Sequence, residues 1–249
     1  MDIGEVRAQA DEYRGFLKEK KATLRPPEFW YPYDSLWNFA RLDQLLEGAD
    51  RDLDTLVDGK PIADIGGGDG DCAFFLETAG QKVHLLDNAS TNFNRLEGAR
   101  VLKDALSSSV EIREVDVDAQ FELPEADYGM VFFLGLLYHL KNPYFALETL
   151  SFKARYCFLS TRIARLAPGG DPPIGDIPVA YLLEEGEIGG DATNYWIFSP
   201  AGLRRLLWRT GWRISSELTG GPAESEPVAL DKDERFFAFL QSRRVHHWT

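Results

Sequence analysis

Apolar residues recur at helical spacing near the start of the chain. Over the first twenty residues, positions three or four apart are apolar: Ile3, Val6, Ala10, Tyr13 and Leu17. This spacing predicts an amphipathic helix over residues 2–20. An aromatic stretch follows at 29–33, and a second helix is predicted at about 35–47. We therefore expect a helical N-terminal cap over residues 1–50.

From residue 51 onward, short apolar runs alternate with helical patterns. Strands are predicted at 61–65, 82–87, 110–115, 128–134 and 156–161, and helices at 72–79, 92–106 and 143–150. Such alternation predicts a parallel sheet that is covered by helices on both faces. The expected fold is α/β and Rossmann-like, in one domain over residues 51–249.

The C-terminal part predicts how the sheet ends. Ser199 and Pro200 mark the start of a helix that stops at Gly211. Two last strands, at 212–218 and 236–240, read as an antiparallel hairpin at the sheet edge, which makes seven strands in all.

Residues 164–194 interrupt this alternation with four prolines, two Gly-Gly pairs and an acidic run. A segment of this length without regular structure is often a lid or a binding loop, so we expect a lid-like loop here.

Glycines gather where the first predicted strand ends. The run Asp64-Ile65-Gly66-Gly67-Gly68-Asp69-Gly70 lies between that strand and the next helix. Glycines let the backbone turn tightly and approach a ligand closely, and the helix that follows presents free N–H groups to it. Ordinary turns also use glycine, so the loop alone is a modest signal.

The next two strand ends carry polar groups that suit an adenosine. Asp87 and Asn88 end the second strand, and a carboxylate there can accept hydrogen bonds from both ribose hydroxyls. The third strand leads into Asp116 and Val117, where a side chain and a backbone N–H can contact an adenine edge. Parallel strands end at the same sheet edge, so we expect these groups and the glycine loop to form one site.

The loop does not fit a dinucleotide or a nucleoside triphosphate. In the G-x-G-x-x-G pattern Asp71 would replace the third glycine and repel a pyrophosphate, and no Lys-Ser/Thr pair follows as in a P-loop. The form Asp-x-Gly-x-Gly-x-Gly, with Asp64, Gly66, Gly68 and Gly70, resembles the first motif of class I S-adenosylmethionine-dependent methyltransferases. Another nucleotide-binding site, or a degenerate one, stays open as the alternative.

This resemblance implies roles for the end of the fourth strand. In these enzymes that strand passes beneath the transferred methyl group, which implies that Leu134 and Gly135 line the cofactor. It also makes Tyr138 and His139 the candidate catalytic residues. His139 has a suitable pKa range for a general base, and the alternative is a structural cap.

The segment Leu-Tyr-His-Leu followed by Asn-Pro more closely resembles the bacterial tRNA wobble-uridine methyltransferase/carboxymethyltransferase family, over roughly Trp30 to Trp212. Members that use carboxy-S-adenosylmethionine hold its carboxylate with a lysine, a tyrosine and an arginine. Tyr138 matches the tyrosine and Arg235 is a candidate for the arginine, but the lysine has no counterpart. The expected cofactor is therefore S-adenosylmethionine, with the carboxylated form as the less favoured choice.

Charge bears on the acceptor. The net charge of −13 disfavours tRNA, whose binding requires positive charge to release counterions. We expect methyl transfer to an unidentified small-molecule or nucleoside acceptor. The alternatives are tRNA wobble-uridine modification and a non-catalytic cofactor-binding module. Arg162 could orient an anionic acceptor, or it could form a surface ion pair.

Other features change the picture less. Trp30, Tyr31, Tyr33 and Trp37 form either an aromatic wall over the site or an ordinary helix-packing cluster. Two cysteines without metal-ligand spacing predict no metal site and a cytoplasmic protein. The longest apolar run, 128–140, is too short to span a membrane. Basic residues near the C-terminus, including His246 and His247, indicate a local basic patch or a frayed tail.

Overall fold

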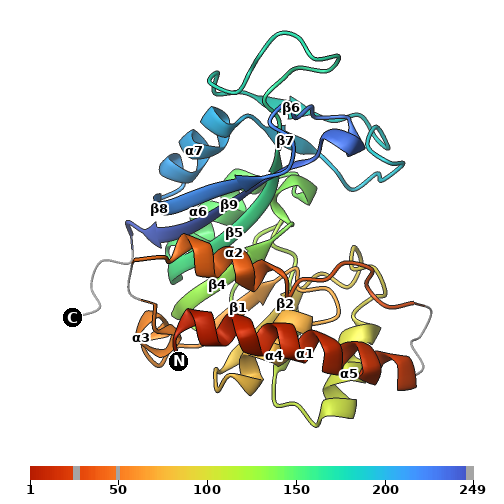
Figure 1. Ribbon diagram of the computed structural model, residues 1–249, viewed down its shortest axis with the longest axis vertical. Coiled ribbons are helices and arrows are strands. Elements are labelled where there is room, and N and C mark those ends of the chain that lie inside the picture. Colours follow the sequence, from red (N-terminus) through yellow and green to blue (C-terminus); the bar gives the residue numbers. More distant parts are fainter. Residues whose placement is uncertain (25–28, 49–50, 245–249) are drawn as a thin grey trace. The chain divides into compact units, whose positions relative to one another are not determined.

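Two units divide the chain in the computed structural model (Figure 1). The first comprises Met1–Asp116 and Gln120–Phe132, and the second comprises Val117–Ala119 and Phe133–Thr249. The structure describes residues 1–24, 29–48 and 51–244, so the predicted basic tail at His246 and His247 lies outside the described residues. The domain boundary predicted at residue 50 stays a prediction.

Helix α1 (Ile3–Thr23) confirms the amphipathic helix predicted at the N-terminus. Its apolar stripe is buried, as the three-to-four spacing requires: Ile3, Val6, Ala10 and Leu17. Asp2 caps the helix, because its carboxylate accepts a hydrogen bond from the Gly4 N–H at 2.7 Å. The second predicted helix is shorter than expected (α2, Asn38–Leu45), and α3 (Leu53–Val57) was not predicted.

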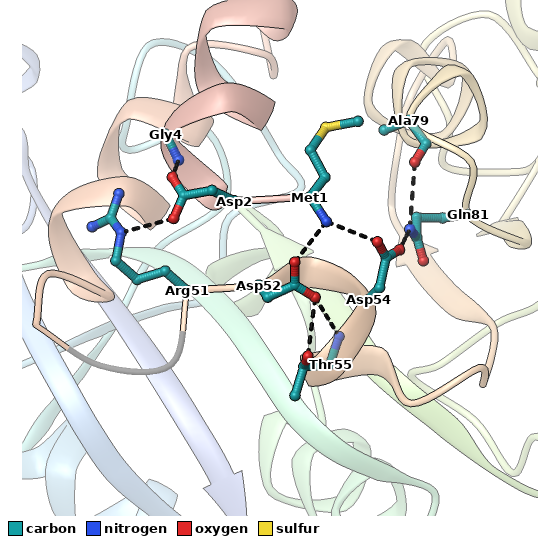
Figure 2. Close-up of polar contacts among 9 residues, drawn as sticks. All are labelled: Met1, Asp2, Gly4, Arg51, Asp52, Asp54, Thr55, Ala79 and Gln81. Carbon is teal, nitrogen blue, oxygen red and sulfur yellow. Dashed lines mark hydrogen bonds and ion pairs between the residues drawn. The ribbon is translucent and has the colours of Figure 1, made fainter.

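The start of α1 is tied to α3 by charge (Figure 2). The Met1 ammonium donates to Asp52 Oδ2 at 2.7 Å and to Asp54 Oδ2 at 2.8 Å. These two hydrogen bonds raise the pKa of the ammonium to about 10, and the bond to Asp52 has the larger effect. Asp54 also accepts from Gln81 Nε2 at 2.7 Å, so one carboxylate joins the chain start, α3 and the segment before the second strand.

Three parallel strands form the sheet of the first unit: β1 (Ile62–Ile65), β2 (Val83–Asp87) and β3 (Glu111–Glu114). β2 lies between the others, with Ile62 opposite Val83 and His84 opposite Glu111. Helices α4 (Asp71–Thr78) and α5 (Glu97–Leu106) connect them. The helix predicted from residue 92 begins five residues later, because Arg95 and Leu96 adopt left-handed φ angles of 58° and 64°.

Strand β4 (Tyr128–Leu134) starts in the first unit and has the bounds predicted for it. The Gly129 N–H donates to the Pro61 carbonyl at 3.0 Å, which places the start of β4 beside the start of β1. A Cβ at Gly129 would lie 2.4 Å from the Val57 carbonyl oxygen, so the close approach of α3 requires glycine here.

The second unit is built on long antiparallel strands (Figure 1). β9 (Glu234–Ser242) pairs on one side with β5 (Ala154–Ile163) and on the other with β8 (Trp212–Gly220). This confirms the predicted C-terminal hairpin. Helices α6 (Pro143–Ser151) and α7 (Pro200–Arg209) flank these strands, and Ser199 Oγ caps α7 by accepting from the Gly202 N–H at 2.9 Å. Single 3-10 turns occur at Leu137–His139 and Leu230–Lys232.

The predicted fold class is confirmed, with an addition. All seven predicted strands are present, and the described residues form two further short strands, β6 (Ala180–Leu182) and β7 (Trp196–Phe198). β6 falls inside the segment expected to be a lid-like loop. That segment is anchored, since the Arg165 N–H donates to the Ser225 carbonyl at 3.0 Å and the Val179 carbonyl accepts from the Ser199 N–H at 3.0 Å. Its role as a lid stays a prediction.

Candidate functional site

The glycine loop forms a narrow backbone cradle after β1. Gly66, Gly68 and Gly70 have φ angles of 70°, 62° and 86°, in the left-handed region that favours glycine. A Cβ at Gly67 would lie 2.5 Å from Asp64 Oδ2. Side chains at these positions would therefore strain the turn or fill the space above Asp64.

Asp64 lies beneath this loop as a buried carboxyl group with an unused oxygen. Its exposed fraction is 2%, and its Oδ2 has no hydrogen-bond partner among the described residues. Burial, assisted by the charges of Asp87 and Asp71, raises its pKa to about 7, although the Ala73 N–H opposes this shift. A buried acceptor without a donor is costly, so the site suits a ligand that brings a cationic donor.

Asp87 ties the end of β2 to the glycine loop. Its Oδ2 accepts from the Gly68 N–H at 3.1 Å and from Asn92 Nδ2 at 2.9 Å, and its Oδ1 accepts from the Asn88 N–H at 2.8 Å. Burial raises the pKa of the Asp87 carboxyl against these three hydrogen bonds. Each carboxylate oxygen has two acceptor sites, so Oδ1 keeps capacity for a ribose hydroxyl. Sequence reasoning did not identify Asn92.

Of the residues after β3, those at 115–116 lie beside the end of β2. The Val115 N–H donates to the Asp87 carbonyl at 2.9 Å, which brings the exposed Asp116 next to the end of β2. Val117 is buried and belongs to the second unit. The predicted contact of these two residues with an adenine stays a prediction.

Asp69 binds the segment before α2 to the loop. Its carboxylate accepts from the Tyr31 N–H and from Asn94 Nδ2, each at 2.7 Å, and Lys21 Nζ lies 3.4 Å away. A Cβ at Gly68 would lie 2.9 Å from the Tyr31 ring, so this ring covers the loop. Lys21 also pairs with Asp71 at 2.8 Å, and thus the anion that rejects a pyrophosphate has a protein partner.

The predicted aromatic wall is only partly realised over the loop. The Tyr31 ring lies on Gly68 and contacts Tyr33 at 5.4 Å between centroids. Tyr33 is 70% exposed, and the Trp30 ring lies 5.4 Å from Lys21 Nζ. Trp37 stacks with Arg41 and is 38% exposed. Tyr31 is thus the aromatic residue that the structure brings to the loop.

In the second unit, the exit of β4 opens into a sharp turn. Gly135 has a φ angle of 69°, and its N–H donates to the Ser160 carbonyl of β5 at 2.9 Å. Leu134 and Gly135 are partly exposed, whereas Tyr138 is only 8% exposed. The Tyr138 hydroxyl accepts a hydrogen bond from Arg235 Nη1 at 3.0 Å. The backbone at 134–135 is therefore open to solvent, and Arg235 holds the Tyr138 hydroxyl in place.

His139 is held in one tautomer. Its Nδ1 lies 3.0 Å from both the carbonyl oxygen and the Oγ1 of Thr193, and Thr193 Oγ1 donates to Asp191 Oδ1 at 2.6 Å. A carbonyl only accepts, so Nδ1 carries the proton and Nε2 keeps a lone pair. Burial, helped by the charges of Arg235 and Arg162, lowers the pKa of His139 against the effects of Thr193 and Asp191. The ring is therefore neutral near pH 7 and is equipped to accept a proton.

Arg162 does not form the surface ion pair that was the simple alternative. It is 5% exposed, and its Nε donates to Asp233 Oδ1 at 2.8 Å. Asp233 Oδ2 accepts from Arg235 Nε at 3.0 Å. Neither Asp233 nor Thr193 was identified from the sequence.

Within residues 1–24, 29–48 and 51–244, no three His, Cys, Asp or Glu side chains are grouped to hold a metal ion. In the same ranges, no helix has the length and apolar character needed to cross a membrane.

Comparison with known proteins identifies the fold. No protein-family model matches the chain, and no curated protein matches its sequence. The N-terminal domain of EvdMO1, solved with SAH bound, matches with a TM-score of 0.57 at 17% identity over 98% of both chains. PH0226 from Pyrococcus horikoshii OT3 matches with a TM-score of 0.53 at 12% identity, over 90% of this chain and 98% of that one.

A SAM-dependent methyltransferase from Methanosarcina mazei matches with a TM-score of 0.53 at 14% identity, over 74% of this chain and 92% of that one. The chain therefore has the fold of SAM-dependent methyltransferases, as its glycine motif predicted. The comparisons give no support to the narrower resemblance to tRNA wobble-uridine enzymes.

Proposed function

We propose that this protein is an S-adenosylmethionine-dependent methyltransferase that acts on a small-molecule acceptor. The observation that carries the proposal is the unpaired, buried Oδ2 of Asp64 beneath a loop with three left-handed glycines. A sulfonium cofactor with an ammonium group supplies positive charge to this acidic cradle, whereas a pyrophosphate supplies the opposite charge. SAH bound to the EvdMO1 domain, which shares the fold, supports the same cofactor.

Each half of the candidate site has a role in this proposal. Asp64 and the backbone of Gly66, Gly67 and Gly68 would hold the amino acid part of the cofactor. Asp87 and Asn88 would hold the ribose, and Asp116 and Val117 the adenine. Leu134 and Gly135 would line the methyl group. When bound, the cofactor supplies an electrophilic methyl group on a good leaving group.

The chain's own contribution to the reaction is placement and proton transfer. Methyl transfer requires the acceptor atom, the methyl carbon and the leaving sulfur in line, and alignment supplies much of the acceleration. An acceptor hydroxyl or ammonium must also lose a proton. Neutral His139, with Nδ1–H fixed by Thr193, would accept that proton at Nε2, and Tyr138 would position the acceptor.

A small acceptor is favoured over tRNA. The net charge is −13, and a polyanion requires extended positive surface. The EvdMO1 domain was also solved in the presence of SAH and D-fucose, which is a small molecule. We propose plain methyl transfer, because the lysine that holds a carboxylated cofactor has no counterpart in this sequence.

Isothermal titration calorimetry with SAH tests the cofactor. We expect micromolar binding, and no heat at millimolar SAH would refute the proposal. Asp87→Ala should weaken binding by roughly 10- to 100-fold, from the loss of hydrogen bonds worth about 1.5–3 kcal/mol. Asn92→Ala is the matched control, since it removes a contact of Asp87 with the protein and leaves the carboxylate for the ribose. Equal losses in both variants would mean that Asp87 acts on the loop alone.

Turnover is tested separately from binding. SAH release is measured over a panel of small hydroxyl, amine and carboxylic acid acceptors. SAH binding without release on any acceptor would favour the non-catalytic binding module.

A further inference from the structure

Two arginines face each other across the β5–β9 pair. Arg162 and Arg235 are directly opposite in the antiparallel register, so their side chains leave the sheet on the same side. Like charges in such a pair are destabilising. Asp233 lies against both guanidinium groups, at 2.8 Å from Arg162 Nε and 3.0 Å from Arg235 Nε. One carboxylate thus serves two cations.

Arg162 is short of partners although it is buried. Its side chain is 6% exposed, and Asp233 is its single ion-pair partner among the described residues. Neither of its Nη groups makes a hydrogen bond within the described part of the chain. Neither is among the fully enclosed unpaired atoms of that part, so both border accessible space. Asp233 engages only Nε, so the two Nη groups can donate to a further anion from that space.

The neighbouring acidic groups are engaged elsewhere. Glu234, next to Arg235 on β9, forms a two-pronged pair with Arg165 at 2.8 Å. Asp191 accepts from Thr193, and Glu187 accepts from the Tyr181 hydroxyl at 2.9 Å. The nearby His139 is neutral at pH 7 because burial lowers its pKa. The arginines and Asp233 therefore leave a net charge of +1.

The cluster adjoins the exit of β4. Tyr138 follows the turn at Gly135, and its hydroxyl accepts from Arg235 Nη1 at 3.0 Å. The Tyr138 hydroxyl proton stays available as a donor, because an arginine has no acceptor. The Tyr138 hydroxyl and Arg235 Nη1 thus lie at the turn that the proposed function assigns to methyl transfer, at 3.7 Å and 4.0 Å from a Cβ built on Gly135. Arg162 is joined to them through Asp233.

We propose that Arg162 and Arg235 bind a carboxylate group of the methyl acceptor, with Tyr138 as a further donor. This inference rests on the proposed function and names its substrate class, which is a small carboxylic acid. A planar guanidinium matches a carboxylate with two parallel hydrogen bonds, and a monoanion balances the net charge of the cluster. A phosphate dianion would leave an excess negative charge.

Binding is tested by 19F NMR with 4-fluorobenzoate and its uncharged match, 4-fluorobenzamide, on the SAH-loaded protein. We expect the acid to bind at least tenfold more tightly than the amide. Arg162→Gln should remove this preference. Equal binding of acid and amide, or tighter binding of 4-fluorophenyl phosphate, would overturn the proposal.

Two further variants separate recognition from stability. Asp233→Asn removes the competing carboxylate, so 4-fluorobenzoate should bind at least threefold more tightly, whereas a purely structural role predicts weaker binding. Arg204→Gln is the matched control, because Arg204 pairs with Glu217 at a more exposed position of the same unit. It should leave the acid preference unchanged. A loss of preference in the control equal to that of Arg162→Gln would refute a specific site.

SAH affinity distinguishes the two levels of failure. If wild-type protein does not bind SAH, the proposed function fails. If it binds SAH but methylates amides as readily as their parent hydroxy acids, only the carboxylate inference fails. A tenfold weaker SAH affinity in Arg162→Gln without any acceptor would assign the arginine to the cofactor and overturn the inference.

Discussion

Replacing Asp64 with Asn should stabilise the cofactor-free protein at pH 8 and weaken its binding of cofactor. The Asp64 carboxyl has a pKa of about 7 in the fold, against an ordinary value of 3.8. At about 1.4 kcal/mol per pKa unit, keeping it ionised costs the fold about 4 kcal/mol. The new amide would place an unpaired N–H₂ near the position of Oδ2, at a cost of about 1–3 kcal/mol. We expect a net gain of about 1–3 kcal/mol.

The sign of the pH dependence follows from the raised pKa. Below pH 3.8 the group is protonated in both the folded and the unfolded chain, so ionisation costs nothing. The cost grows as the pH rises and becomes constant above about pH 7. The stability advantage of Asp64→Asn should therefore grow between pH 5 and pH 8. The affinity of the wild type for the cofactor should rise over the same pH range, since only the ionised Asp64 carboxylate holds the ammonium group.

Urea denaturation without cofactor, at pH 5 and pH 8, measures the stability difference, and calorimetry with SAH measures binding. We expect SAH affinity of the wild type to rise through pH 7, and that of Asp64→Asn to be about 10- to 100-fold weaker, as for a lost charged hydrogen bond. Asp104→Asn, which removes an exposed charge in the same unit, is the control. Parallel pH–stability curves for wild type and Asp64→Asn would refute the reasoning.

Three further predictions concern other parts of the chain. With an acceptor in hand, kcat/KM should fall as His139 is protonated, at a pH lower than for an ordinary histidine because burial lowers the pKa of His139, and His139→Gln should lower the rate and abolish this limb of the pH profile. Gly129→Ala should lower the free energy of unfolding by about 1–3 kcal/mol, because its Cβ would meet the Val57 carbonyl, whereas Gly15→Ala, with open space around it, should raise it by about 0.5–1 kcal/mol. Ser199→Ala should cost about 0.5–2 kcal/mol in urea denaturation from the lost helix cap.

The hydrophobic pattern predicted well those elements that are buried along their whole length. β4 was predicted with its observed bounds, because its apolar run is buried almost throughout. The start of α5 was predicted wrongly for a reason that hydrophobic spacing does not reveal. Asn92 Oδ1 accepts from the Asn94 N–H at 3.1 Å and from the Leu96 N–H at 2.8 Å, and these bonds build a turn where a helix was expected.

The candidate site was predictable where it follows a strand end. The glycine loop and Asp87 are fixed by local sequence, since each follows directly from β1 or β2. Asp233 and Thr193 were missed because their partners are distant in sequence. Arg162 and Asp233 are 71 residues apart, and His139 and Thr193 are 54 apart. Only the pairing of β5 with β9 and the return of the chain past Tyr138 bring such residues together.

The three contacts of Asp69 have a consequence for how this protein changes over evolutionary time. Its carboxylate joins the glycine loop to Lys21 in α1 and to Asn94 before α5, as well as to the backbone of Tyr31. A substitution at position 69 would remove the acceptor that donors from three segments share, although Lys21 would keep its ion pair with Asp71. Positions 21, 69 and 94 should therefore be inherited as a set. A glycine loop grafted from a relative should fold only together with that relative's counterparts of Lys21 in α1 and Asn94 before α5.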